Sequence, residues 1–281
     1  MPVPGIRSGV GPDAVDRLLV PFLTEPGTAG VFTDFDGTLA PIVDDPDAAR
    51  PLPEAVDVLH RLAARYRTVA VVSGRPAAFL VTHLRLAGPR DGGGDGGGRL
   101  LGIGLYGLEQ ADGEGVWVDP RVATWRSVVD GVAGRADREA PDGVLVERKG
   151  LSLALHFRTA PGASAWAARW AAEQAERTGL VRHGARMSEE LRPPLAIDKG
   201  TVVADLGAGL RAACFVGDDR GDLPAFAALD ALAGDRGVVA LKVAVHSVEA
   251  PAELLAAADV VVDGPGGAVD LLSRLLGPPR P

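Results

Sequence analysis

Asp34 and Asp36 stand two residues apart, directly after the short apolar segment 31–33. A lone pair of this spacing more often forms a turn or caps a helix than it performs chemistry. A carboxylate can, however, attack a phosphate monoester where a bound cation and fixed donors neutralise the oxygens of the transferring group. We therefore predict that Asp34 is a nucleophile that forms an aspartyl-phosphate. Asp36 is predicted to protonate the leaving oxygen and later to deprotonate the attacking water.

Three further polar residues follow along the chain. Ser73 and Asp218 each come after an apolar run, and Lys199 precedes a helix-like segment. Serine can hydrogen-bond a phosphoryl oxygen, lysine can cancel charge on the nucleophile and the phosphate, and aspartate can help to hold a hard cation. Taken singly, each is more often part of a turn or a solvated surface charge. Their order along the chain and their places at strand ends favour a joint catalytic role.

The elements that must position these residues alternate between strands and helices. Residues 69–72 form an apolar run without alternation, which is typical of a strand covered on both faces. Strands are expected at residues 31–33, 69–72, 100–106, 213–216, 238–243 and 259–262, with helices at 54–65, 201–210 and 267–276. This alternation predicts an α/β fold with a doubly wound parallel sheet, in which ligands bind at the carboxyl ends of the strands.

The middle of the chain has the pattern of a separate module. Strands are expected at residues 116–118, 144–146 and 151–157, and helices at 120–138 and 164–178. We therefore expect a core domain of residues 1–112 and 193–281 and an inserted α+β module of residues 113–192. The segment 91–98, DGGGDGGG, has too few apolar groups to pack and is expected to be a surface insertion without a function of its own.

Composition limits the partners of the chain. Its 281 residues include 29 Lys and Arg against 37 Asp and Glu, a formal net charge of −8, and no basic run is long enough to follow a nucleic acid backbone. No segment has the length and hydropathy to span a bilayer, and no signal peptide is predicted. Cys214 is the only cysteine, so no intrachain disulfide can form. These features predict a cytoplasmic protein that binds neither nucleic acid nor membrane.

The four polar segments together resemble the motifs of the haloacid dehalogenase superfamily. They are residues 34–38 (DFDGT), 73–75 (SGR), Lys199 and 217–219 (GDD). The resemblance implies a Rossmann-like core with an inserted cap domain. It also implies that Mg²⁺ is bound by Asp34, by the backbone carbonyl of Asp36 and by Asp218, with Asp219 and Asp222 as supporting or alternative ligands.

A narrower resemblance is to the trehalose-6-phosphate phosphatase family. It is carried by residues 39–41, 107–109, 147–149, 156–158, 190–193 and 198–200. By this resemblance the inserted module is a cap that binds the disaccharide through Glu147, Lys149, His156, Arg158, Glu190 and Arg192. Charged side chains suit that role because sugar hydroxyls need hydrogen-bond partners once they are buried. The alternative interpretation is a cluster of surface ion pairs along a strand.

The chain departs from the pattern of that family at two places. Tyr106 precedes Gly107 where the family has histidine, and residues 221–223 (GDL) lack one acidic side chain of the last motif. The resemblance implies hydrolysis of trehalose 6-phosphate to trehalose and inorganic phosphate in trehalose biosynthesis, by a monomer that can associate with trehalose-phosphate synthase. Two alternatives stay open: a phosphatase for another sugar phosphate, and a non-catalytic subunit that binds a sugar-phosphate synthase.

Overall fold

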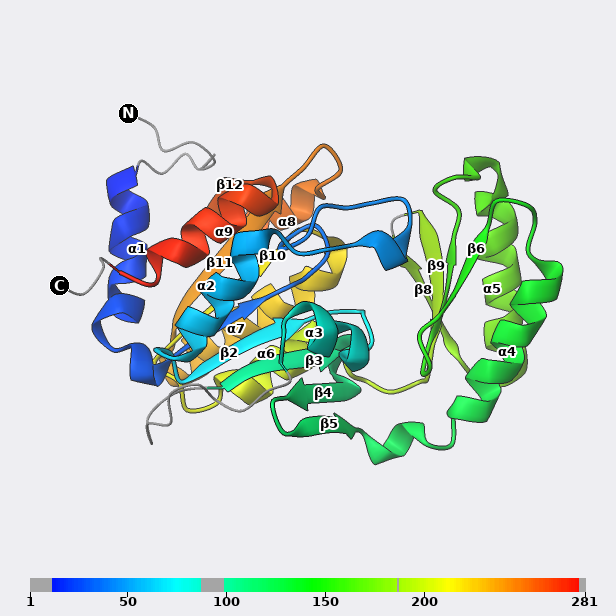
Figure 1. Ribbon diagram of the computed structural model, residues 1–281, viewed down its shortest axis with the longest axis horizontal. Helices are drawn as coiled ribbons and strands as arrows, with labels where there is room; N and C mark the ends of the chain where they lie inside the picture. The colour runs from blue at the N-terminus through cyan, green and yellow to red at the C-terminus, as the bar shows by residue number, and fades with distance from the viewer. Residues whose placement is uncertain (1–11, 87–98, 186, 278–281) are drawn as a thin grey trace. The chain divides into compact units, whose positions relative to one another are not determined.

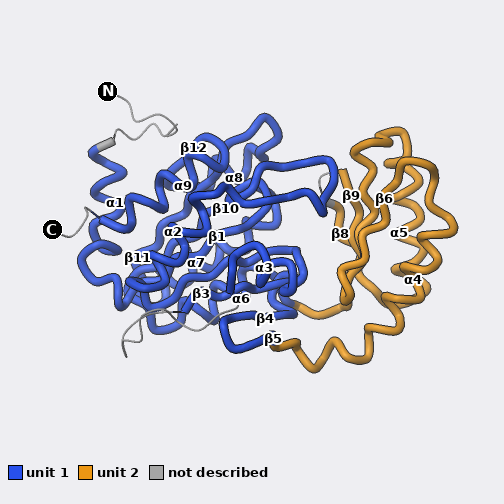
Figure 2. The backbone as a smooth tube through the Cα atoms, viewed as in Figure 1, with its two compact units in different colours: residues 1–116, 197–281 blue, residues 117–196 orange. Residues whose placement is uncertain are grey.

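The computed structural model describes residues 12–86, 99–185 and 187–277 (Figure 1). The chain divides into two compact units, one of residues Met1–Val116 and Ile197–Pro281 and one of residues Trp117–Ala196 (Figure 2). The sequence places these boundaries four residues earlier, after residues 112 and 192. The glycine-rich segment 91–98, which we expect to be a surface insertion, lies outside the described residues.

Eight strands of the described chain form one sheet in the order β12-β11-β10-β1-β2-β3-β4-β5 (Figure 1). The strands from β12 to β3 are parallel, whereas β4 runs antiparallel to β3. The predicted doubly wound parallel sheet is thus confirmed, with an antiparallel addition at one edge. The strands are β1 (Ala29–Thr33), β2 (Thr68–Val72), β3 (Arg99–Gly104), β4 (Glu109–Asp112), β5 (Gly115–Val118), β10 (Ala212–Gly217), β11 (Val239–His246) and β12 (Val260–Asp263).

Helices pack on both faces of this sheet because its central strands are apolar on both sides. Val31 of β1 belongs to the hydrophobic core under α1, α2, α3 and α9, and the next residue, Phe32, belongs to the core under α6, α7 and α8. The helices are α1 (Pro12–Thr24), α2 (Pro53–Ala63), α3 (Ala77–His83), α6 (Lys199–Gly207), α7 (Leu223–Arg236), α8 (Ala252–Ala257) and α9 (Gly264–Arg274).

The second unit is a four-stranded antiparallel sheet with two helices on one face. The strand order is β6-β7-β9-β8, and the apolar residues Leu153, Leu155 and Leu191 belong to a core shared with α4 and α5. The elements are α4 (Arg126–Glu139), β6 (Leu145–Arg148), β7 (Leu153–His156), α5 (Ser164–Thr178), β8 (Val181–Ala185) and β9 (Ser188–Arg192). The expected α+β character of this region is confirmed.

Several elements differ from the sequence-based expectation. The strand β5, expected in the inserted module, lies at the edge of the large sheet, because it hydrogen-bonds β4. The third core strand ends at Gly104 rather than at Tyr106, since Leu105 and Tyr106 adopt positive φ angles. The expected helix 120–138 is a short turn, Pro120–Val122, followed by α4. The helices α1, α3, α7 and α8 and the strands β4, β8 and β9 were not predicted.

Candidate active site

The predicted core residues lie at the carboxyl ends of strands on both sides of the point where the strand order reverses. Asp34 follows β1, Ser73 follows β2 and Asp218 follows β10, and β1 is paired with both other strands. The chain leaves β1 for β2 on one side and later returns to β10 on the other. In a doubly wound sheet, this switch point is where ligands bind.

A buried ion cluster joins Asp34 to Lys199. The Lys199 Nζ atom lies 2.8 Å from Asp34 Oδ1 and 2.7 Å from Asp222 Oδ1, and all three side chains are buried. Lys199 is the first residue of α6, whose start is fixed by a capping box between Asp198 and Thr201. The lysine thus brings its positive charge to the nucleophile that the sequence predicts.

Asp218 approaches the same cluster from β10. One carboxylate oxygen from each of Asp34, Asp218 and Asp222 lies within 4.8 Å of the others. Gly37, at a φ of +76°, allows this approach, because a Cβ atom there would lie 2.1 Å from Asp218 Oδ2. The glycine of the first motif is therefore needed both for its backbone angle and for the space beside Asp218.

Burial dominates the protonation of these carboxyl groups. It raises the pKa of Asp34 well above its ordinary value, although Lys199 opposes this effect, and Asp222 adds to it. For Asp218, burial and then the neighbouring Asp34 and Asp222 raise the pKa to about 9. Burial therefore opposes the ionised form of both carboxyl groups, and the single positive charge of Lys199 does not reverse its effect on Asp34.

The donor set of this cluster fits a divalent cation. Asp34, Asp218 and Asp222 carry three negative charges when ionised, against the single positive charge of Lys199. Hard cations such as Mg²⁺ prefer carboxylate oxygens, and a cation here would keep these groups ionised at neutral pH. Asp222 already accepts hydrogen bonds from Lys199 and from the backbone N–H of Asp218 at 2.8 Å. Asp34 and Asp218 thus have more oxygen atoms available for a cation than Asp222 has.

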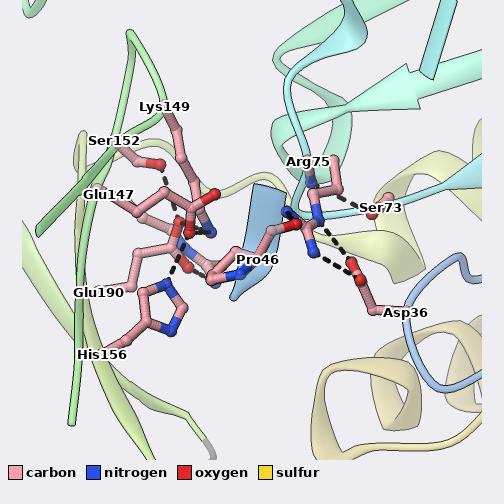
Figure 3. A network of polar contacts seen from close by, with 10 residues as sticks. Asp36, Pro46, Ser73, Arg75, Glu147, Lys149, Ser152, His156 and Glu190 are labelled. Carbon is pink, nitrogen blue, oxygen red and sulfur yellow. Dashed lines mark hydrogen bonds and ion pairs between the residues drawn. The ribbon is translucent and has the colours of Figure 1, made fainter. Parts of the chain in front are cut away.

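Asp36 pairs with Arg75. The Arg75 Nε and Nη2 atoms donate to Asp36 Oδ2 and Oδ1 at 2.8 and 2.7 Å (Figure 3). The same guanidinium donates to the carbonyl oxygen of Pro46 at 2.8 Å and lies 4.7 Å from the centre of the Phe79 ring. The side chain of Asp36 does not belong to the carboxylate cluster of Asp34 and Asp218. Arg75 thus holds the predicted acid and base in one orientation.

Ser73 is buried beside Arg75 in the loop after β2. The Ser73 hydroxyl oxygen accepts a hydrogen bond from the backbone N–H of Arg75 at 3.2 Å, and the Ser73 N–H donates to the Ile103 carbonyl at 2.9 Å. The loop therefore fixes the position of the hydroxyl, which can still donate its own hydrogen to an acceptor.

A second polar cluster forms on one face of the sheet in the second unit. Glu147 of β6 and Glu190 of β9 both lie directly opposite Ala154 of β7, so the three residues share a face. His156 and Arg192 stand two residues along their strands and share it too. The core residues Leu153, Leu155 and Leu191 lie on the other face, against the helices. Arg158 lies in the turn that follows β7.

Glu190 is the centre of this cluster (Figure 3). Its Oε1 atom accepts from the Ser152 hydroxyl at 2.8 Å and lies 3.4 Å from Lys149 Nζ, and its Oε2 atom accepts from Arg192 at 2.5 Å. Burial alone would raise the pKa of Glu190, but Lys149, Arg192 and Ser152 lower it to about 2. Glu147 Oε2 lies 2.7 Å from His156 Nε2 and 3.7 Å from Lys149 Nζ.

Sequence reasoning missed two members of these clusters. Arg75 was part of a recognised motif, but nothing in the pattern shows that its partner is Asp36. Ser152 lies outside every segment that carries the resemblance, and a serine beside a strand gives no signal of its own. Of the predicted residues, the structure brings Asp34, Lys199 and Asp218 into one cluster and Glu147, Lys149, His156, Glu190 and Arg192 into another.

Comparisons with known proteins find similar sequences and similar folds. A model of the trehalose-phosphatase family matches residues 32–87. The trehalose-phosphate phosphatase of Mycolicibacterium paratuberculosis is 37% identical over 211 residues, 71% of this chain and 51% of that relative. The C-terminal domain of C. albicans trehalose-6-phosphate phosphatase has a TM-score of 0.72 at 21% identity, covering 94% of this chain and 96% of that chain. The C-terminal domain of a Candida albicans trehalose synthase regulatory protein has a TM-score of 0.59 at 15% identity, covering 88% and 94%.

The fold, with aspartates at the ends of β1 and β10 and a lysine between them, is the one that the resemblance to the haloacid dehalogenase superfamily implies. Within the segments that align, the chain is similar to the trehalose-phosphatase family. It spans about half the length of the curated relatives that it matches. In the part of the chain that the structure describes, no helix combines the length and hydropathy needed to cross a membrane.

Proposed function

We propose that this chain hydrolyses trehalose 6-phosphate to trehalose and inorganic phosphate in trehalose biosynthesis. The observation that carries the proposal is the contact between Asp34 Oδ1 and Lys199 Nζ, 2.8 Å apart, at the switch point of the sheet beside Asp218. A carboxylate held this way is neutralised in part and can reach a phosphate dianion. The trehalose-phosphate phosphatase relatives favour the disaccharide phosphate as substrate.

In the proposed first step, a carboxylate oxygen of Asp34 forms a bond to phosphorus and the bond from phosphorus to the sugar oxygen breaks. Asp36 gives a proton to the leaving oxygen, which becomes the hydroxyl of trehalose. In the second step, a water oxygen attacks phosphorus while Asp36 accepts its proton, and the bond between phosphorus and Asp34 breaks. Inorganic phosphate leaves and both aspartates return to their starting states.

Three groups support this chemistry. The Ser73 hydroxyl donates to a phosphoryl oxygen, and Lys199 offsets charge on Asp34 and on the phosphate. We propose that Asp34, Asp218 and the backbone carbonyl of Asp36 hold Mg²⁺. Such an ion supplies positive charge against the phosphoryl oxygens and keeps the nucleophile ionised.

We propose that the second unit, residues 117–196, is the cap that selects the sugar. Glu147, Lys149, His156, Arg158, Glu190 and Arg192 are the proposed ligands of the disaccharide. Glu190 stays ionised near neutral pH, because its pKa is about 2, so it offers acceptor oxygens to sugar hydroxyls. The predicted cytoplasmic location and association with a trehalose-phosphate synthase stay predictions.

The test is phosphate release from a panel of substrates with and without Mg²⁺. The panel contains trehalose 6-phosphate, glucose 6-phosphate, sucrose 6-phosphate and 4-nitrophenyl phosphate. We expect the highest kcat/KM for trehalose 6-phosphate, with activity that depends on Mg²⁺. A higher kcat/KM for another sugar phosphate would contradict the proposed substrate but would still agree with the proposed phosphatase mechanism. No release from any substrate would favour the non-catalytic alternative, since a regulatory protein domain shares this fold.

A further inference from the structure

Tyr106 adopts a backbone conformation that tyrosine seldom takes. Its φ is +63°, and the residue before it, Leu105, has a φ of +48°. The Cβ atoms of L residues clash with the backbone in this left-handed region, so two successive bulky residues there must be held by their surroundings. Arg85 and Met187 are the other non-glycine residues with a positive φ in the described part of the chain.

The groups that hold this turn belong to the loop after β2. The Leu105 N–H donates to the Arg75 carbonyl oxygen, and the Tyr106 N–H donates to the Ser73 carbonyl oxygen, each at 2.9 Å. Glu109, three residues beyond Tyr106, accepts a hydrogen bond from the Ala77 N–H at 2.6 Å. The strained turn therefore binds the backbone of the loop that carries Ser73 and Arg75.

The Tyr106 side chain lies against the same loop. A Cβ atom on Gly74 would be 2.5 Å from the Tyr106 Oη atom and 2.7 Å from its Cζ atom, so the phenol ring covers the glycine between Ser73 and Arg75. On the other side of the turn, a Cβ atom on Gly107 would lie 2.8 Å from Ile197 and from Val202. The turn thus packs between the Ser73 loop and the segment around the start of α6, where Lys199 lies.

We propose that Tyr106 is a positioning residue: its left-handed turn and its ring together fix the loop of Ser73, Gly74 and Arg75. Through that loop, Tyr106 sets the position of the Ser73 hydroxyl and of the guanidinium that holds Asp36. This inference rests on the proposed function, because it assigns the turn to phosphoryl transfer. It explains why a strained conformation is kept at this place, since strain persists where the surrounding structure requires it.

The first test compares variants of Tyr106. Tyr106→Gly and Tyr106→Asn both tolerate a positive φ but remove the ring, whereas Tyr106→Phe keeps it. We expect about a tenfold or larger fall in kcat for the two variants without a ring and a change within about threefold for Tyr106→Phe. Arg85→Gly is the matched control, since it relieves the same backbone conformation away from the site, and its kcat should not change. Equal losses for Tyr106→Phe and Tyr106→Gly would overturn the role of the ring.

The second test places each Tyr106 variant in a Ser73→Ala background, with 4-nitrophenyl phosphate used where rates are low. If Tyr106 acts through Ser73, the fall in kcat caused by Tyr106→Gly should shrink to about threefold or less once the hydroxyl is gone. An undiminished fall both in the Ser73→Ala background and in an Arg75→Ala background, or a wild-type kcat for Tyr106→Gly, would overturn the proposal. A wild-type enzyme that cleaves the aryl phosphate but not trehalose 6-phosphate would refute the proposed substrate and leave this test intact.

Discussion

Both carboxylate oxygens of Asp36 accept hydrogen bonds from the guanidinium of Arg75, at 2.7 and 2.8 Å. Arg75 is itself buried and contacts the Pro46 carbonyl and the Phe79 ring. Its guanidinium is therefore held in place by groups other than Asp36. A planar guanidinium holds a carboxylate in a fixed orientation, which lysine cannot do. The proposed acid and base is therefore oriented by a neighbour outside the carboxylate cluster.

We predict that Arg75→Lys and Arg75→Ala lower kcat more for trehalose 6-phosphate than for 4-nitrophenyl phosphate. The sugar alkoxide needs a proton to leave, whereas nitrophenolate leaves without one, so misplacing Asp36 should cost about 10- to 100-fold on the sugar substrate alone. Steady-state kinetics on both substrates check this. Equal losses on both substrates would show that Arg75 only supports the fold of the loop.

Neighbouring glutamates of β9 provide a test of the sugar site. Glu190→Gln should lower kcat/KM for trehalose 6-phosphate by about 10- to 100-fold, or about 1–3 kcal/mol, and should change hydrolysis of 4-nitrophenyl phosphate little. Glu189→Gln is the control, because Glu189 pairs with Arg182 and lies on the opposite face of the sheet. Similar effects of the two substitutions on trehalose 6-phosphate would remove the main support for the cap assignment.

The lowered pKa of Glu190 also predicts how the stability of the fold depends on pH. Its folded pKa, about 2, lies below the ordinary value of 4.5, so the ionised group stabilises the fold above about pH 4.5. That contribution, on the order of 3 kcal/mol, is lost as the pH falls from about 4.5 towards 2. Urea unfolding at pH 6 and pH 3 should therefore show a smaller loss of stability for Glu190→Gln than for wild type. An equal loss of unfolding free energy in wild type and in Glu190→Gln would contradict the lowered pKa of Glu190.

The carboxylate cluster predicts that a chelator silences the enzyme and that Mg²⁺ restores it. Ca²⁺ should bind without restoring turnover, because its looser coordination misplaces nucleophile and phosphorus. Mg²⁺ should also raise Tm, and its affinity should increase from pH 6 to pH 9 as Asp218, with a pKa of about 9, loses its proton.

Asp218→Asn should abolish the Mg²⁺-dependent rise in Tm. Asp230→Asn is the control, since Asp230 is exposed and paired with Lys242 outside the cluster. Full activity in excess chelator would show that the cluster does not serve a cation.

The sequence predicts the parallel strands of the sheet well and its antiparallel edge poorly. Apolar runs such as β1, β2 and β10 have one stable environment, a sheet covered on both faces. The residues of a short strand such as β5 do not indicate which strand it will pair with. Its place beside β4 therefore becomes visible only in the folded structure. The helix α7 was missed although Phe226, Leu229 and Leu232 recur at three-residue intervals, a pattern that the sequence does contain.

The candidate site shows the same division between local and tertiary information. Strand ends locate Asp34 and Asp218 because parallel strands present their carboxyl ends at one edge. The pairing of Arg75 with Asp36 spans 39 residues, and that of Lys149 with Glu190 spans 41. No local pattern encodes such contacts. The catalytic and sugar-binding roles of all these residues stay predictions until the variants are assayed.

The most direct measurement is to trap the covalent intermediate. The enzyme is mixed with trehalose 6-phosphate labelled with ³²P, quenched in acid within the first turnover and digested, and the labelled peptide is identified. We predict label on the peptide that contains Asp34, and none in Asp34→Asn, which should fold normally and lack turnover because an amide cannot attack phosphorus. Rapid hydrolysis without protein-bound label, or label on another residue, would contradict the account.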